Sequence, residues 1–484
     1  MSFFQTLLSL FLGQRGAAAE DEQDGMAAGG QSAPPGASVI AMVSPFGDPA
    51  VDGPEGSMMR ALGGRSELAV RQASRRISLA GEGTLASRLT VAAESAREMA
   101  VQNNADLVVW GAVSPDTGDL NIRILPMRSE ALTRPGAVGL GDLLRLPKNF
   151  PASIGDLVYA AVLAAVPPRN ELHQREILGE LSPLLNRLED VFAGEPAGLS
   201  ASQAFSALVT FANCQAALAG RTRNNELMSV AAGNFQRAID MPVAATLPLD
   251  AGMAQSHRAA CFMFLADQTK EWSYLETAAE AYASAADLFG EEQEEDRALA
   301  QMHRGQALHR HGVNGSEAKS LQSAIEAYGD ALKVFTRHRS PQRWGEIMNG
   351  QGMTLAQLAE NYSGTVLAER AVDCFVKALE VRRRDLSPSL WAASQNNLGA
   401  ALFSLGKQTG DNSLLARSST AFRGAMEVYK EMGATSSAQV LQKNIGRVER
   451  LLETRGGAPA PSDAPATAES AGDDPAPDGK KDAG

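Results

Sequence analysis

The pattern of apolar and polar residues changes character about one third of the way along the chain. Between residues 38 and 167, short apolar runs typical of buried strands alternate with segments whose apolar residues recur every three or four positions, as in helices. From about residue 180 onward the strand signals fade and the helical spacing continues. We therefore expect a small α/β domain, an α+β sandwich, followed by an all-α region.

The elements of the first domain can be predicted from these runs. Strands are expected at 38–46, 75–81, 105–113 and 119–127, and a Pro-Asp-Thr-Gly turn joins the last two in a hairpin. Helices are expected at 56–64, 86–104 and 154–166. Ser57 is the residue type that favours the N-cap of the first of these helices. A connecting helix is expected within 168–199.

An aromatic residue recurs in the all-α region at intervals of 46 or 47 residues. The series is Phe235, Tyr282, Tyr328, Phe375 and Phe422. Each has an alanine three residues later and a small residue four residues earlier, so the three share one helix face. A parallel series keeps the interval of 47 residues: Gly305, Gly352, Gly399 and Gly446. This periodicity predicts helical repeats in which a ring fills the gap between helices and a glycine permits close backbone contact.

The phrase Ser-Pro-x-x-Trp also occurs twice, beginning at Ser340 and at Ser387. Serine is a favoured N-cap, and proline is harmless in the first turn because its missing N–H has no partner there. The phrase therefore predicts two helix starts, with Trp344 and Trp391 as packing anchors.

These repeats resemble the tetratricopeptide repeat (TPR). The segment NNLGAAL at 396–402 is similar to the first helix of that repeat and contains its Leu-Gly pair, and AVDCFVKAL at 371–379 is similar to the second. The resemblance covers residues 200–455. The period of 47 exceeds the family's period of about 34, and Arg304 replaces an expected leucine. The resemblance implies a non-enzymatic adaptor or scaffold whose concave face binds a protein or peptide partner.

The family's groove-lining positions lie three residues before, and one and four residues after, each repeated glycine. Transferred to this chain, they are Met302, Gln306, His309, Asn349, Met353, Ala356, Asn396, Ala400, Phe403, Lys443, Arg447 and Arg450. Asn349 and Asn396 are side chains of the kind that fixes a peptide backbone in such grooves. The last three form one basic stripe, which suggests an acidic peptide or carboxylate partner. The alternative is the solvated face of a terminal capping helix.

Residues 38–125 resemble the small α/β domain found beside such repeats in bacteria and in the amino-terminal part of TolB-like envelope proteins. The segments IAMVSPFGDP and ADLVVWGAV carry this resemblance. It implies no catalytic residue. It leaves open the alternative that the protein is exported and helps to assemble a periplasmic or membrane complex.

The two ends of the chain differ from the rest in composition. Residues 1–15 are expected to form a short apolar helix, 16–37 an acidic Gly/Pro-rich linker, and 456–484 a disordered acidic tail. The apolar side chains of residues 2–12 favour docking on a membrane surface or a partner. A cleaved export signal and a disordered terminus are the alternatives. We expect a cytoplasmic location with peripheral membrane contact, or a periplasmic one if the terminus is a signal.

Charge and motif content exclude several classes of function. The net charge of −12 argues against nucleic acid as a partner. The three scattered cysteines, Cys214, Cys261 and Cys374, show neither disulfide nor zinc spacing. No phosphate-binding loop, metalloprotease motif or serine-hydrolase elbow is present. We therefore predict no enzymatic activity, no cofactor and no metal.

Two weaker signals remain as alternatives. The turns that follow the first two predicted strands contain Asp48, Asp52, Glu82 and Thr84, and these residues would serve a small-ligand sensor. The segment HRGQALHRHG clusters His303, His309 and His311. A metal site there lacks matching carboxylate or cysteine ligands, so we expect exposed histidines near a helix end.

Overall fold

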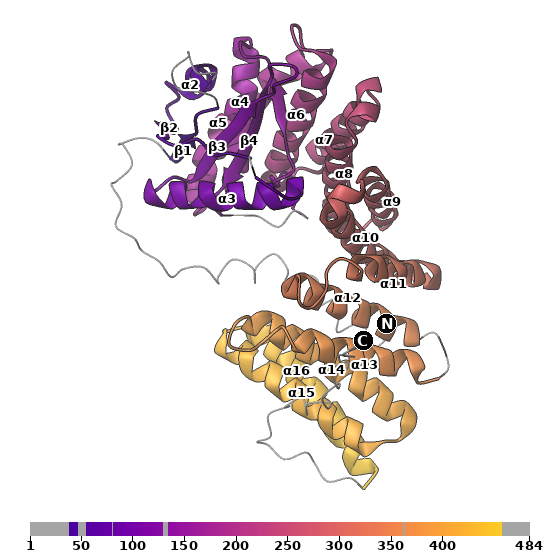
Figure 1. Ribbon diagram of the computed structural model, residues 1–484. Helices are drawn as coiled ribbons and strands as arrows, with labels where there is room; N and C mark the ends of the chain where they lie inside the picture. Colours follow the sequence, from indigo (N-terminus) through magenta and orange to yellow (C-terminus); the bar gives the residue numbers. More distant parts are fainter. Residues whose placement is uncertain are drawn as a thin grey trace, which may run out of the picture. The chain divides into compact units, whose positions relative to one another are not determined.

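The computed structural model describes residues 38–46, 55–79, 81–128, 134–360, 362 and 364–456 (Figure 1). The chain divides into two compact units, whose described residues run 38–336 and 337–456. We call them the first and the second unit. The predicted fold class, a small α/β domain followed by a helical array, is confirmed.

Among the described residues, a five-stranded sheet forms the start of the first unit. Its strands are β1 (Val39–Val43), β2 (Leu68–Gln72), β3 (Leu107–Val113), β4 (Leu120–Pro126) and β5 (Leu144–Leu146), in the order β2-β1-β3-β4-β5. Strands β1, β2 and β3 are parallel, and β4 and β5 are antiparallel to their neighbours. The predicted hairpin is confirmed, since Leu107 of β3 pairs with Pro126 of β4.

One predicted strand is wrong, and another was missed. The second strand lies at 68–72 rather than 75–81. Its central side chains are only half buried at the edge of the sheet, so its apolar signal is weak. Ile77 made 75–81 look like a strand, but its side chain packs under α3 and its N–H donates to the hydroxyl of Ser44. Strand β5 has three residues, which is too short for a periodic signal.

Helices cover both faces of the sheet. These helices are α2 (Glu55–Leu62), α3 (Leu85–Gln102), α4 (Ala152–Ala165) and α5 (Glu171–Phe192). Helix α3 packs on the face formed by Met42, Val108 and Trp110, whereas α4 and α5 contribute to the core on the opposite face (Figure 1). The predicted cap of α2 is wrong. Ser57 lies inside the helix, and its hydroxyl donates to the carbonyl of Lys148 at 2.6 Å.

The rest of the first unit is a helical array. It comprises α6 (Ala201–Thr222), α7 (Asn225–Ile239), η1 (Pro242–Thr246), α8 (Pro248–Thr269), α9 (Ser273–Leu288), η2 (Glu291–Gln293), α10 (Glu294–Gly315) and α11 (Ala318–Leu332). Each α-helix packs on the next, and α6 also packs on α4 and β5. The array therefore begins directly against the α/β domain and shares its core.

The second unit continues the same pattern of successive packed helices. It contains α12 (Pro341–Ala359), α13 (Val366–Leu379), α14 (Pro388–Thr409), α15 (Asn412–Glu431) and α16 (Thr435–Thr454). The two predicted Ser-Pro helix starts are confirmed at α12 and α14. However, neither Ser340 nor Ser387 makes a side-chain capping hydrogen bond, so the prolines rather than the hydroxyls mark these starts.

The repeated aromatic and glycine residues meet each other in space. The rings of Tyr328, Phe375 and Phe422 are buried, each 23 residues after a repeated glycine. A methyl group added to Gly305, Gly352 or Gly399 would lie 2.8 Å from the corresponding ring, which is closer than real contacts allow. Glycine at these positions therefore permits the ring of one helix to reach the backbone of the other, as predicted.

Burial also explains the cysteines. All three are buried free thiols, and burial raises the pKa of Cys214 and Cys261 to about 12. No helix in the described ranges is both long enough and apolar enough to cross a membrane. Three predicted segments lie outside the described residues: the apolar helix 1–15, the linker 16–37 and the acidic tail, of which only Gly456 is described.

Candidate functional site

The three basic residues predicted at the last repeat lie on one exposed face of α16. Lys443, Arg447 and Arg450 are spaced by four and three residues, which places them along one side of the helix, and all three are exposed. The other side is apolar: Leu441, Ile445, Val448 and Leu452 are buried, and α16 packs on α15. We call Lys443, Arg447 and Arg450 the basic stripe.

Several basic residues of the second unit form ion pairs. Arg423 on α15 donates to Glu449 on α16 at 2.7 Å, Arg384 contacts Glu431 at 2.7 Å, and Lys377 contacts Asp373 at 2.8 Å. The pair with Glu449 neutralises a carboxylate close to the basic stripe. Glu453 is the remaining acidic residue of α16 and is exposed in its last turn.

The distribution of charge between the two units was not predicted. Residues 337–456 contain 16 lysines and arginines against 11 aspartates and glutamates, a net charge of +5. Residues 38–336 contain 25 basic against 35 acidic residues, a net charge of −10. The overall charge of −12 therefore conceals a basic second unit, and the basic stripe belongs to that unit.

The other predicted groove residues do not form an open surface. Met302 and His309 of the first unit are buried, as are Asn349, Met353 and Asn396 of the second. Gln306 and Phe403 are half buried. Ala356 and Ala400, at the same repeat positions, are buried too. Among the predicted positions, only those of α16 are exposed.

Asn349 joins two helices of the second unit. Its Oδ1 accepts hydrogen bonds from the hydroxyl of Ser394 at 3.0 Å and from Nδ2 of Asn397 at 3.3 Å, both on α14. The hydroxyl of Ser394 in turn accepts from the guanidinium of Arg382 at 3.0 Å, and Arg382 is itself buried. The hydrogen bonds that we expected Asn349 to offer a peptide are made inside the protein.

The histidine cluster is buried, which corrects the expectation of exposed histidines. His303, His309 and His311 are each at most 9% exposed. Nδ1 of His311 lies 3.0 Å from the hydroxyl of Ser320 on the neighbouring helix α11. In the part of the chain that the structure describes, no group of three or more histidine, cysteine or carboxylate side chains has metal-binding geometry.

The residues proposed for a small-ligand sensor are only partly described. Asp48 and Asp52 lie outside the described residues. Glu82 is exposed, and the Thr84 hydroxyl accepts a hydrogen bond from the N–H of Ser87 as the N-cap of α3. Thr84 therefore has a structural role at the start of this helix.

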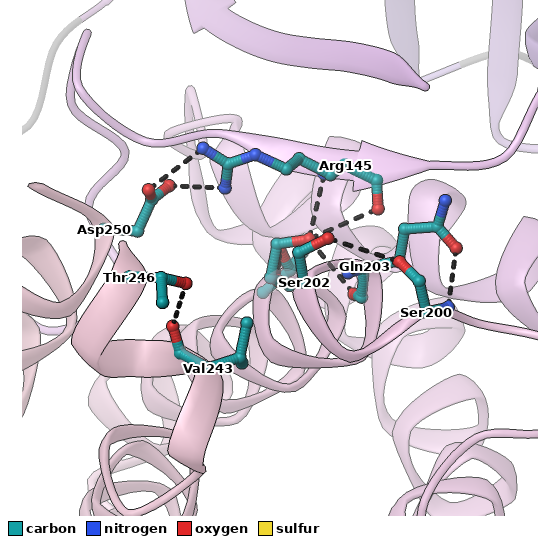
Figure 2. Close-up of polar contacts among 9 residues, drawn as sticks. Arg145, Ser200, Ser202, Gln203, Val243, Thr246 and Asp250 are labelled. Atoms are coloured by element: carbon teal, nitrogen blue, oxygen red, sulfur yellow. Dashed lines mark hydrogen bonds and ion pairs between the residues drawn. The ribbon is translucent and has the colours of Figure 1, made fainter. Parts of the chain in front are cut away.

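Two ion pairs that sequence reasoning missed join β5 and the preceding loop to α8. Arg145 of β5 contacts both carboxylate oxygens of Asp250, at 2.8 and 3.0 Å, as Figure 2 shows. About two turns further along α8, Nε2 of His257 lies 2.7 Å from Oδ1 of Asp142. Burial favours the neutral form of His257, but the charge and hydrogen bond of Asp142 outweigh it and raise the pKa of the imidazole.

A small cavity lies beside the second of these pairs. It has a volume of about 60 Å³ and is lined by side chains of β4, β5 with the loop before it, α4, α6 and α8, including Asp142, Asn213 and His257. At about 30 Å³ per molecule this is room for roughly two waters, far below the hundreds of Å³ of a small-molecule pocket. Oδ1 of Asn213 is buried without a protein partner among the described residues, and a water would satisfy it.

For each of these ion pairs, the sequence indicates the residue on α8 but not its partner. Asp250 and His257 are polar residues seven positions apart in a helix that is otherwise rich in buried small side chains, so both fall on one buried face. Their partners are more than 100 residues away in the chain and follow no pattern. The position of the polar face could thus be predicted, but not what it contacts.

Comparison with known proteins leaves the family open: no protein-family model matches this chain, and no curated protein matches its sequence.

Proposed function

We propose that this protein is a non-enzymatic adaptor of the TPR type, which binds an acidic segment of a protein partner through the basic stripe. The observation that carries the proposal is the exposure of Lys443, Arg447 and Arg450 along one side of α16, in a unit with a net charge of +5. Arginine suits such a surface because its planar guanidinium binds a carboxylate through two parallel hydrogen bonds.

The arrangement of the repeats supports a binding rather than a catalytic role. The repeated spacing of ring and glycine serves packing between helices, and the polar residues at the inner repeat positions are buried or, at Gln306, half buried. The surface left for a partner is on α16, the last described helix, which is packed on one side and exposed on the other. Terminal repeats commonly carry such a polar outer face, so exposure alone does not distinguish binding from solubility. The net charge of the unit favours binding.

The proposal is tested by affinity capture with quantitative mass spectrometry on three chains. The stripe variant carries Lys443→Glu, Arg447→Glu and Arg450→Glu. The control variant carries Arg370→Glu, Lys407→Glu and Lys430→Glu, three exposed basic residues on α13, α14 and α15 of the same unit. Both variants change the charge equally. We expect a partner that is retained by the wild type and the control variant and lost from the stripe variant. An identical set of partners for all three chains would contradict the proposal.

A further inference from the structure

The basic stripe lies next to the most acidic end of the chain. Helix α16 ends at Thr454, and residues 457–484 contain six aspartates and glutamates against two lysines, a net charge of −4. Lys443, the farthest member of the stripe, is about 16 Å from the end of the helix at 1.5 Å per residue. Charges of opposite sign thus occur close together in one chain.

We propose that the acidic segment 457–484 binds the basic stripe of its own chain and competes there with an external acidic partner. This inference shares its surface with the proposed function but does not depend on it, because segment and stripe can bind each other in the absence of any partner.

The length of the segment allows this contact. The first acidic residue, Asp463, is nine residues beyond Thr454, and nine extended residues span about 30 Å. This exceeds the 16 Å back to Lys443, so the chain can reverse and still reach the whole stripe. The remaining acidic residues, up to Asp482, follow within the next 19 positions. Several carboxylates are therefore available to three cationic side chains.

Tethering favours this segment over an acidic surface of a second copy. The first unit also offers acidic residues, since 267–296 contains ten acidic residues and one basic residue. A second copy, however, is present only at the concentration of the protein, typically micromolar. A segment attached within a few residues of the stripe has an effective concentration on the order of 1 mM. For similar contacts, the attached segment is favoured by two to three orders of magnitude.

The proposal is tested with purified full-length chains and a fluorescent synthetic peptide of residues 457–484. The neutral-tail variant replaces every carboxylate of the segment: Asp463→Asn, Glu469→Gln, Asp473→Asn, Asp474→Asn, Asp478→Asn and Asp482→Asn. Its stripe remains intact but loses its charged competitor. If the free peptide binds with a Kd of about 100 μM, competition at an effective 1 mM weakens its binding to the wild type about tenfold. We therefore expect fluorescence anisotropy to show about tenfold tighter binding to the neutral-tail variant.

Matched variants identify the surface that binds. In the neutral-tail background, the substitutions of the stripe variant should abolish peptide binding, and those of the control variant should change it less than twofold. Binding should also weaken as salt is raised from 0.05 to 0.5 M, because exposed charges are screened. Lys443→Gln, Arg447→Gln and Arg450→Gln together, which remove charge without reversing it, should weaken binding at least fivefold and guard against a loss of folding.

Equal affinity of the peptide for the wild type and the neutral-tail variant would overturn the proposal and would leave the stripe open to an external partner. Absence of binding to the neutral-tail variant would overturn it too. Neither result bears on affinity capture, which detects partners of the stripe directly, so the failure of this inference can be told from the failure of the proposed function.

Discussion

The same repeat position has opposite environments in the interior and at the end of the second unit. Three residues before the repeated glycine stand Asn349 in α12, Asn396 in α14 and Lys443 in α16. The two asparagines are at most 5% exposed, whereas Lys443 is exposed. The difference arises from what packs against each helix. The side chains of α14 contact Asn349, but no further described helix follows α16.

This difference shows that the repeat period fixes where a residue lies on its helix, but not whether the side chain is buried or exposed. In the interior copy at Asn349 this position joins two helices, because its carboxamide oxygen accepts hydrogen bonds from α14. In the terminal copy no further described helix packs on this position, and Lys443 is exposed there. This is why we propose the binding surface on α16, the last helix among the described residues.

The largest effect is expected from the interior ring. Phe422 is fully buried against Gly399, and Phe422→Ala should destabilise α14 and α15 by about 3–5 kcal/mol because it leaves a cavity. Hydrogen exchange of the peptides that cover these helices measures this. Met432→Ala, at a residue that is 45% exposed, is the matched control and should cost less than about 0.5 kcal/mol. Similar exchange in both variants would show that the rings are not the core of the repeats.

In the first unit, a buried ion pair between His257 and Asp142 provides a charged interior for comparison. Asp142→Asn removes the charged acceptor of the buried His257 and should cost about 1.5–3 kcal/mol near neutral pH. Because Asp142 raises the pKa of His257 above its ordinary value of about 6.5, the folded unit holds a proton that the unfolded chain releases. This stabilisation is complete below about pH 6.5 and is lost as pH rises through the raised pKa.

Thermal unfolding between pH 6 and pH 9 measures this dependence. The wild type should lose stability as pH rises, and His257→Gln should remove most of that slope. Burial also raises the pKa of Asp296 to about 6, with contributions from Glu295 and Asp142, so its effect falls largely below this range. An unchanged slope in His257→Gln would mean that another group titrates.

A direct comparison at one repeat position should give a smaller but clear difference. Asn349→Ala leaves Ser394 and Asn397 without their shared acceptor and should cost about 1–3 kcal/mol. Lys443→Ala, at the equivalent position of α16, should change stability by less than about 0.5 kcal/mol. Hydrogen exchange of α12 and α16 provides both values. Equal costs would contradict the distinction between interior and terminal helices.

The repeated glycines should give effects of opposite sign. Gly399→Ala gains about 1 kcal/mol of helix propensity but forces a methyl group against the buried ring of Phe422, which typically costs 1–3 kcal/mol. Gly446→Ala gains the same propensity, and nothing among the described residues lies within 4 Å of the new methyl group. We expect the first substitution to be neutral or destabilising and the second to stabilise by up to about 1 kcal/mol. Stabilisation by both would show that the interior contact is loose.

Much of the fold could be predicted because its signals are local or periodic. The contact of Gly399 with Phe422 follows from two series with one period, and the hairpin of β3 and β4 from two apolar runs around a turn. The prediction placed the second strand at 75–81 instead of 68–72. The edge strand β2 has few buried residues and so a weak apolar signal, whereas the nearby Ile77 is buried although it is not in a strand.

The candidate site was predictable only in part. The basic stripe is a spacing within one helix, so its side chains could be assigned to one face from the sequence. The burial of Asn349 depends on Ser394, which is 45 residues away, and the partner of His257 is 115 residues away. Such pairings are set by tertiary packing and leave no periodic trace in the chain.

The most direct test of the central claim is covalent labelling of lysines by an amine-reactive ester, read by mass spectrometry. The sample is the neutral-tail variant together with its captured partner, before and after the partner is removed with 1 M salt. We predict that Lys443 is protected in the complex and becomes reactive after the partner is removed, whereas Lys430, exposed on α15, reacts equally in both states. Equal reactivity of Lys443 with and without the partner would contradict the assignment of α16 as the binding surface.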